Sequence, residues 1–316
     1  MIVTVTLNPA LDKTAYVDAV RPHALHRLRD VQLDAGGKGV NVSAMIHALG
    51  GESIAVGFAG GGAGKELLSL IVQKGLYTDF VHIAAVTRTN LKVVDNDGVL
   101  TEFNEPGPHI NSGEWGALEQ KLAGLAVKGN TIVLSGSLPA GLGKDTYKKL
   151  SAMLRQSGAA VFLDADGDAF KLALENGSDA VPDYIKPNRF ELLQYFGVAD
   201  DDSILDAKLV ELCRSLLEKG VKLVVLSMGE AGAIFVNRSG VWRAPALTVQ
   251  VRSTVGAGDS MIGALVYGFA SALPDEQCFA LSMAASAGAC TTEGTNPPDC
   301  LLVNKLLEQT RIERIA

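Results

Sequence analysis

Paired cysteines are absent from the sequence. The four cysteines are scattered, with no CxxC pair and no nearby histidine: Cys213, Cys278, Cys290 and Cys300. A disulfide framework and a zinc site each require a regular spacing of their ligands, so neither is expected. We expect these thiols to be buried or unreactive.

A long apolar run and a leader-like start are also missing. The longest apolar stretch, IGALVYGFASAL, is interrupted by glycine and is too short to span a bilayer. Met1 is followed at once by IVTVTL, without the basic segment and small-residue cleavage site of a secretory signal. We therefore expect a cytoplasmic protein with no membrane partner.

The chain has no excess of positive charge. It carries 28 Lys and Arg against 35 Asp and Glu, a formal net charge of -7, which gives no electrostatic reason to bind nucleic acid. Its 316 residues suffice for one large α/β domain or two small ones. Because no repeat, low-complexity tract or linker marks a boundary, we expect one domain over residues 1–316.

What the sequence does contain is a series of short β-rich runs separated by helical patterns. The runs are IVTVTL, SIAVGF, TIVLSG, AVFLDA, DYIKP and LVVLSMG. Strands that alternate with helices predict a doubly wound, mainly parallel sheet covered on both faces. After Gly258 the pattern is helical, near 259–272, 275–292 and 299–309, with prolines between the segments.

Two regions break this alternation. Residues 12–34 contain strand-like pieces without a helix, and NLKVVDNDGVLTEFN reads as two strands around an Asn-Asp-Gly turn. We expect residues of about 12–34 and 88–105 to form a small β-sheet lid.

The stretch VGAGDS, at 255–260, precedes a long helical pattern. If Gly256, Ala257 and Gly258 directly precede a helix, their free N–H groups and the helix dipole form an anion hole that suits a phosphoryl group. A carboxylate at Asp259 could then accept a proton from an attacking hydroxyl. The alternative is that Asp259 only stabilises the start of the helix.

A second glycine-rich stretch is AGGKGVN. Gly36, Gly37 and Gly39 would let a ligand approach the backbone, while Lys38 offers a cation and Asn41 offers donors and acceptors at a helix start. The alternative is a tight turn capped by Asn41.

A third stretch, FAGGGAGKELL, only partly matches a phosphate-binding P-loop. Ala59 replaces the first required glycine, and Glu66 follows Lys65 where the motif needs serine or threonine. We therefore expect residues 60–64 to form a simple turn. The first strand leads into NPALD instead of GxGxxG, which argues against dinucleotide binding.

In KPNRFELLQYFG, Asn188 and Glu191 have the spacing of a helix capping box. Their oxygens could also hold the water ligands of a Mg²⁺ ion.

Together and in this order, these stretches resemble the ribokinase/PfkB family of carbohydrate kinases over essentially the whole chain. GGKGVN and STVGAGDSMIGAL resemble the two family signatures, with LNPALD, TRTN, SGSLP, KPNRFE and VLSMGEAGA around them. The resemblance implies a three-layer α/β/α fold with a β-sheet lid that is frequently used for dimer contacts, and ATP and Mg²⁺ as cofactors.

The resemblance also implies roles for the matching residues. Asp259 is expected to be the catalytic base, with Gly256, Ala257 and Gly258 as the anion hole. The residues expected to contact the sugar are Asp12, Gly37, Lys38 and Asn41. Those expected on the nucleotide side are Lys186, Asn188, Ser227, Gly229 and Gly232, with Asn188 and Glu191 organising Mg²⁺ through water.

Within the family, TRTNLKV and SGSLP resemble the branch that phosphorylates sugars already carrying a phosphate. A dianion suits an arginine fork, so Arg88 is expected to bind that phosphate and Ser137 to contact the substrate. Arg27 and Arg29 are candidate helpers, or simply a solvated lid face. The implied substrate is a ketohexose monophosphate, first fructose 1-phosphate, with tagatose 6-phosphate or fructose 6-phosphate as alternatives.

One position departs from the family pattern. Ser253 stands where some members have an acidic residue near a monovalent cation, so the resemblance does not establish a potassium requirement. Two other classes of function stay open: a sugar-phosphate sensor without turnover, and a kinase for an unphosphorylated sugar or nucleoside, which Arg88 disfavours.

Overall fold

The computed structural model describes residues 1–175, 177–201 and 204–316. Within them, eleven strands form one sheet, in the order β15-β14-β13-β12-β11-β10-β9-β1-β4-β5, with β6 also on β4. The bounds are β1 (Ile2–Thr6), β4 (Ser53–Gly60), β5 (Tyr77–Thr78), β6 (Val81–Ile83), β9 (Thr131–Ser135), β10 (Ala160–Asp164), β11 (Tyr184–Ile185), β12 (Leu223–Ser227), β13 (Ala233–Asn237), β14 (Gly240–Ala244) and β15 (Glu313–Arg314).

The strands from β5 to β12 run parallel, and the six β-rich runs of the sequence correspond to β1, β4, β9, β10, β11 and β12. The prediction of a mainly parallel sheet is therefore confirmed. The sequence analysis did not anticipate β13, β14 and β15, which extend one edge of the sheet in antiparallel fashion.

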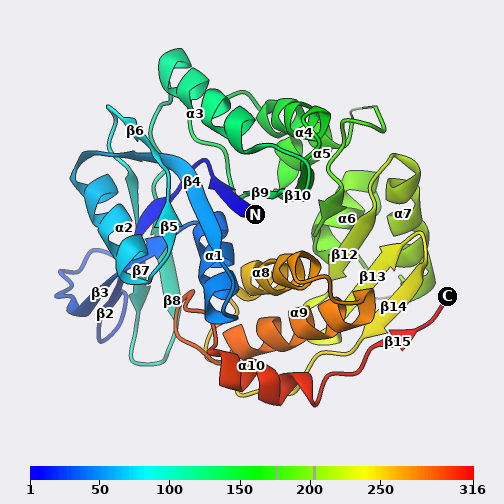
Figure 1. The fold of residues 1–316 in the computed structure, drawn as a ribbon. Helices are drawn as coiled ribbons and strands as arrows, with labels where there is room; N and C mark the ends of the chain where they lie inside the picture. The colour runs from blue at the N-terminus through cyan, green and yellow to red at the C-terminus, as the bar shows by residue number, and fades with distance from the viewer. Residues whose placement is uncertain (176, 202–203) are drawn as a thin grey trace.

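Different helices cover the two faces of the sheet (Figure 1). Side chains alternate along each buried strand, so Ile132 and Leu134 pack into one helix layer while Val133 packs into the other. The first layer holds α3 (Ser112–Leu125), α4 (Thr146–Gln156), α5 (Gly167–Ala173), α6 (Arg189–Phe196) and α7 (Asp206–Glu218). The second holds α1 (Lys38–Ala48), α2 (Gly61–Gln73), α8 (Ala257–Ala270) and α9 (Asp275–Ala289), with α10 (Cys300–Leu307) against α9. This is the predicted three-layer α/β/α fold.

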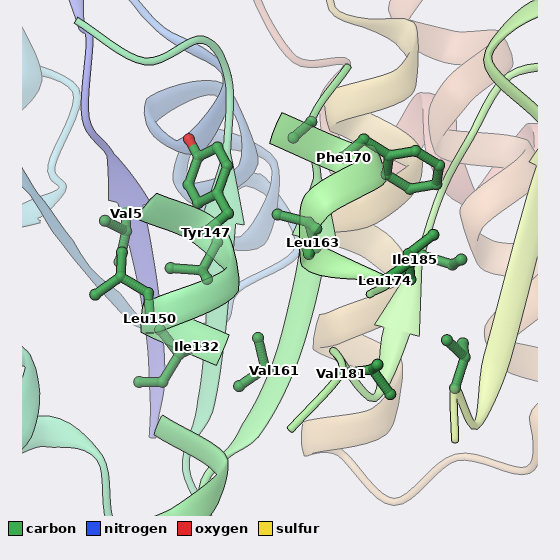
Figure 2. Packing of buried hydrophobic residues seen from close by; sticks show 14 of the residues in the cluster. Val5, Ile132, Tyr147, Leu150, Val161, Leu163, Phe170, Leu174, Val181 and Ile185 are labelled. Atoms are coloured by element: carbon green, nitrogen blue, oxygen red, sulfur yellow. The ribbon is translucent and has the colours of Figure 1, made fainter. Parts of the chain in front are cut away.

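Figure 2 shows part of the first layer, where Tyr147 and Leu150 of α4 lie against the strand side chains Val5 and Ile132. The ring of Tyr147 is buried, and its hydroxyl donates a hydrogen bond of 2.9 Å to the carbonyl oxygen of Gly136. Gly136 directly follows β9, so this contact ties the core to the loop at the carboxyl end of the sheet.

A separate four-stranded sheet has the order β3-β2-β7-β8 and lies to one side of the main sheet (Figure 1). Its strands are β2 (Ala10–Tyr16), β3 (Arg29–Gly36), β7 (Arg88–Val94) and β8 (Leu100–Asn104). β7 and β8 are antiparallel around the expected turn, with Gly98 at a φ of 78°. This sheet is the lid that the sequence indicates.

One local prediction and one alternative interpretation were wrong. Residues 61–64 are not a simple turn, because they form the first turn of α2 directly after β4. Asn41 is not a cap, because α1 begins at Lys38 with Gly37 as its N-cap, and this leaves the Asn41 side chain buried one turn inside the helix. Across the described ranges, no helix has the length and apolar character that crossing a bilayer requires.

Candidate active site

A cavity of about 450 Å³ lies at the carboxyl ends of the central parallel strands. β1 is flanked by β4 and β9, so the chain winds away from it in both directions, and the ends of β1, β9 and β10 border the cavity. Such a switch point is where doubly wound sheets bind ligands. The expected site residues that line it are Asp12, Gly37, Lys38, Asn41, Arg88, Ser137, Lys186, Gly256, Gly258 and Asp259.

Asp259 is a buried carboxylate in the first turn of α8. Its Oδ2 accepts a hydrogen bond of 2.8 Å from the Asn41 side chain, since α1 and α8 pack together. Burial and the negative charge of Asp164 raise the pKa of Asp259 to about 6, against the opposing effects of Asn41 and Lys38. A carboxylate with this pKa is a stronger base than an exposed aspartate and is still ionised at pH 7.

The helix after this turn starts two residues earlier than predicted, at Ala257 instead of Asp259. The helix begins at Ala257, so Gly256 is its N-cap, and a φ of 80° there requires a residue without a side chain. Ala257 N–H donates to the Thr254 carbonyl at 3.4 Å. Among the described residues, the N–H groups of Gly256, Gly258 and Asp259 therefore have no backbone partner at this end of the dipole, beside the cavity.

The inner face of the lid brings a second charged pair to the cavity. Asp12 lies opposite Asn90 in the lid register, and its carboxylate accepts from Asn90 Nδ2 at 3.0 Å and Lys92 Nζ at 2.8 Å. Both Asp12 and Lys92 are buried. The sequence analysis named Asp12 but neither of its partners.

Several polar atoms at the cavity lack a partner in the described part of the chain. They are Thr6 Oγ1, Asn8 Oδ1, Asn90 Oδ1 and Arg88 Nε, all on cavity-lining residues. The two terminal nitrogens of Arg88 donate to the carbonyl oxygens of Asn8 and Glu105, at 2.9 and 3.0 Å. Buried groups without partners are costly, which is a sign that a polar ligand satisfies them.

Asp164 and Asp166 also line the cavity and were not predicted. Asp164 is buried at the end of β10, with its carboxylate 3.1 Å from Lys38 Nζ and 3.4 Å from Lys186 Nζ. Burial alone would raise the pKa of Asp164, but the two ammonium groups hold it below its usual range. The run AVFLDADGD contains a detectable signal, because polar residues directly after a buried strand lie at the edge where ligands bind.

Asn188 and Glu191 lie at the start of α6 and form the capping box that their spacing indicates. Asn188 Oδ1 accepts from Glu191 N, and Glu191 Oε2 accepts from Asn188 N, both at 2.8 Å. Burial raises the pKa of Glu191. Neither residue lines the cavity itself.

The remaining expected nucleotide residues lie on the next strand. Ser227 ends β12 and forms a bridge with Asn188. Gly229 starts the short 3₁₀ turn Gly229–Ala231, and Gly232 closes it with its carbonyl accepting from Met228 N. Ser227 and Gly229 lie at the carboxyl end of β12, and the described lining of the cavity includes none of these three residues.

Arg27 and Arg29 lie outside the cavity. Arg27 is exposed between β2 and β3. Arg29 pairs with Asp18 at 2.9 Å and donates to Asn96, so it is held on the outer part of the lid. In this conformation both arginines lie on a solvated face of the lid, which is the alternative that the sequence left open.

Among known protein families, the model described as "pfkB family carbohydrate kinase" matches residues 5–300 of this chain. A 1-phosphofructokinase from Xanthomonas campestris is 40% identical over 291 residues, covering 90% of this chain and 89% of that protein. Another from Bacillus subtilis is 32% identical and covers 100% of both chains. The crystal structure of phosphofructokinase-2 from Escherichia coli in complex with potassium aligns with a TM-score of 0.91 at 29% identity, covering 98% of each chain.

Proposed function

The chain belongs to the pfkB family of carbohydrate kinases, and we propose on that premise that it transfers the γ-phosphoryl group of ATP to fructose 1-phosphate, forming fructose 1,6-bisphosphate. Its similarity to 1-phosphofructokinases over the full chain makes it a sugar-phosphate kinase. The observation that carries the finer proposal is the buried Asp259 carboxylate, with a raised pKa, at the start of α8 and facing the cavity.

In this proposal Asp259 accepts the proton of the free primary hydroxyl of the sugar. The hydroxyl oxygen forms a bond to the γ-phosphorus as the bond to the ADP oxygen breaks. The N–H groups of Gly258 and Asp259, with the ammonium groups of Lys38 and Lys186, stabilise the negative charge of the transferred group. The two N–H groups and Lys38 belong to helices, and Lys186 directly follows β11, so little reorganisation accompanies the reaction.

The lid side of the cavity would bind the sugar phosphate. Arg88 is a fixed cation there, and its unpartnered Nε is available to a phosphate oxygen. Asp12 and Asn41 would bind sugar hydroxyls, and the free oxygens of Thr6, Asn8 and Asn90 would accept from others. Ser137 lies beside them, where its hydroxyl accepts from Asn8 Nδ2 at 3.2 Å. A lid that covers the substrate would exclude water and limit ATP hydrolysis.

The nucleotide would extend over β11 and β12, past Lys186 and Asn188 to Ser227, Gly229 and Gly232. Among the described residues, no group of three or more His, Cys, Asp or Glu side chains could hold a metal ion. This fits Mg²⁺, which keeps several waters and binds mainly through nucleotide phosphates. Glu191 has one carboxylate oxygen outside the capping box that could accept from such a water. Bound with ATP, Mg²⁺ would neutralise phosphate charge.

The outer face of the lid supports the expected homodimer. Leu33, Lys13, Leu91 and Phe103 lie side by side across its four strands, and Leu33 and Phe103 are exposed. A second copy of this chain would cover the exposed Leu33 and Phe103 in that row. Sedimentation velocity of the wild type and of Phe103→Glu would test this, with the variant expected to shift towards monomer.

A coupled assay of ADP release tests the function itself. We expect fructose 1-phosphate to give the highest kcat/KM, ahead of tagatose 6-phosphate and fructose 6-phosphate, with unphosphorylated fructose far behind. A different preferred sugar phosphate would correct the substrate but keep the mechanism. Binding of a sugar phosphate without ADP release would favour a sensor and contradict the proposal.

A further inference from the structure

Asp164 joins three separate parts of the candidate site. It ends β10, where the strand register places it next to Lys186, the residue that follows β11. Its other carboxylate oxygen faces Lys38, the first residue of α1. One carboxylate therefore holds two ammonium groups that come from different elements.

Both ammonium groups lie close to the turn at the start of α8. A Cβ atom placed on Gly258 would be 3.1 Å from Lys186 Nζ, so this amine lies directly against the turn. Lys38 lines the same cavity and is partly exposed to it, with 38% of its side chain accessible. Two like charges this near to one carboxylate would move apart without it.

We propose that Asp164 is a positioning residue, whose carboxylate holds Lys38 and Lys186 as a pair at the mouth of the α8 turn, where the transferred phosphoryl group lies. This inference rests on the proposed kinase reaction. Pairing with Asp164 fixes both amines before the nucleotide arrives, and preorganised charge is what stabilises a transition state efficiently.

The same carboxylate acts on Asp259. The groups that face Asp259 are Asp164 from β10, Lys38 and Asn41 from α1, and Lys186 from the segment after β11. Asp164 is the one negative charge in this set, so it opposes ionisation of Asp259, while the other three favour it. A neutral residue at position 164 should therefore make Asp259 a weaker base, whereas a purely structural role of Asp164 would leave its basicity unchanged.

The chain offers a matched control at the opposite end of the same sheet. Asp183, directly before β11, is also buried and pairs with two cations, Arg155 at 3.4 Å and Lys222 at 2.8 Å. It does not line the cavity. Because Lys222 is largely exposed, Lys222→Met removes one of these pairs with little risk to folding.

The test compares wild type, Asp164→Asn and Lys222→Met with ATP and the preferred sugar phosphate over a range of pH. We expect Asp164→Asn to lower kcat by roughly tenfold or more, with a small change in KM for the sugar phosphate. The acid limb of its kcat/KM profile should move to lower pH. Lys222→Met should match the wild type in all three quantities.

Unchanged kcat and an unchanged acid limb in folded Asp164→Asn would overturn the inference. The proposed kinase function would still hold in that case, provided that the wild type is active. An inactive wild type would instead reject the function. If Asp164→Asn does not fold, Asp164→Glu and the pair Lys38→Met and Lys186→Met replace it. We then expect each lysine variant to lose activity and Asp164→Glu to keep the acid limb near that of the wild type. Full activity in both lysine variants would contradict the proposal.

Discussion

Asp183 and Asp164 occupy opposite ends of the same parallel sheet, and each is a buried carboxylate paired with two cations. At the amino end, Asp183 also accepts from Val161 N at 2.8 Å, and Arg155 donates to two backbone carbonyls. At the carboxyl end, Asp164 lies in a cavity beside a second carboxylate whose pKa is raised. At the amino end the buried carboxylate is thus satisfied by protein groups and lines no described cavity, whereas at the carboxyl end it lines the candidate site.

The two ends of the sheet also differ in their unsatisfied polar atoms. Four of the six residues with such buried atoms in the described ranges line the cavity, and Asp183 is not among the six. A fold selected only for stability would pair these groups or replace them. The carboxyl end therefore keeps unpaired hydrogen-bonding atoms at a cost in stability, as expected of the proposed substrate site.

The largest effect should come from substituting Asp183, the carboxylate with a structural role. Asp183→Asn leaves Arg155, whose side chain is mostly buried, without its carboxylate, and should lower the free energy of unfolding by roughly 3 kcal/mol. Denaturant unfolding measures this, and kcat of the remaining folded enzyme should equal that of the wild type. A large change in kcat would show that the two ends of the sheet are not independent.

At the other end, Asp259→Asn should reduce kcat by about a hundredfold or more, because the proposed general base is lost while the cavity keeps its shape. Steady-state kinetics with fructose 1-phosphate measures the loss. A wild-type kcat would remove Asp259 from the mechanism.

Arg88→Ala should have a smaller effect, which should appear in KM more than in kcat. It removes a cation from a group that does not react, so KM for the sugar phosphate should rise about tenfold while kcat changes less. Arg29→Ala is the matched control, since Arg29 pairs with Asp18 on the outer lid. An equal rise in KM for Arg29→Ala would place that residue at the substrate and not on a solvated face.

The motifs of the sequence predicted several of the residues that line the cavity, namely those in continuous stretches. GGKGVN and VGAGDS supplied Lys38, Asn41 and Asp259, because each stretch combines a glycine turn with a polar residue at a helix start. Periodicity likewise predicted the parallel strands and the lid hairpin. The helix start at Gly61 was missed, because three glycines favour a turn locally and packing of Leu67 and Ile71 decides otherwise.

The ion pairs of Asp164 and the contacts of Lys92 and Asn8 could not be recognised from a motif, although Asp164 itself is visible as a polar residue at the end of a buried strand. Each of the three is a single polar residue in or just after a strand, and its role depends on which strands are neighbours. Lys92 reaches Asp12 only because β2 pairs with β7, a contact that links residues 80 positions apart. Strand order, and not local pattern, assembles this half of the site.

The most direct test of the account is the free energy of unfolding of the wild type and Asp259→Asn between pH 4 and pH 8. The pKa of Asp259 is about 6 in the fold against 3.8 in an unfolded chain, so its ionisation opposes folding. The free energy of unfolding of the wild type should therefore fall as pH rises from about 4 to about 6. We predict that Asp259→Asn avoids this loss and becomes more stable than the wild type by on the order of 2 kcal/mol above pH 7, with the advantage shrinking towards pH 4. A variant that is less stable than the wild type at every pH would contradict the claim that this carboxylate is kept in the fold for chemistry at the expense of stability.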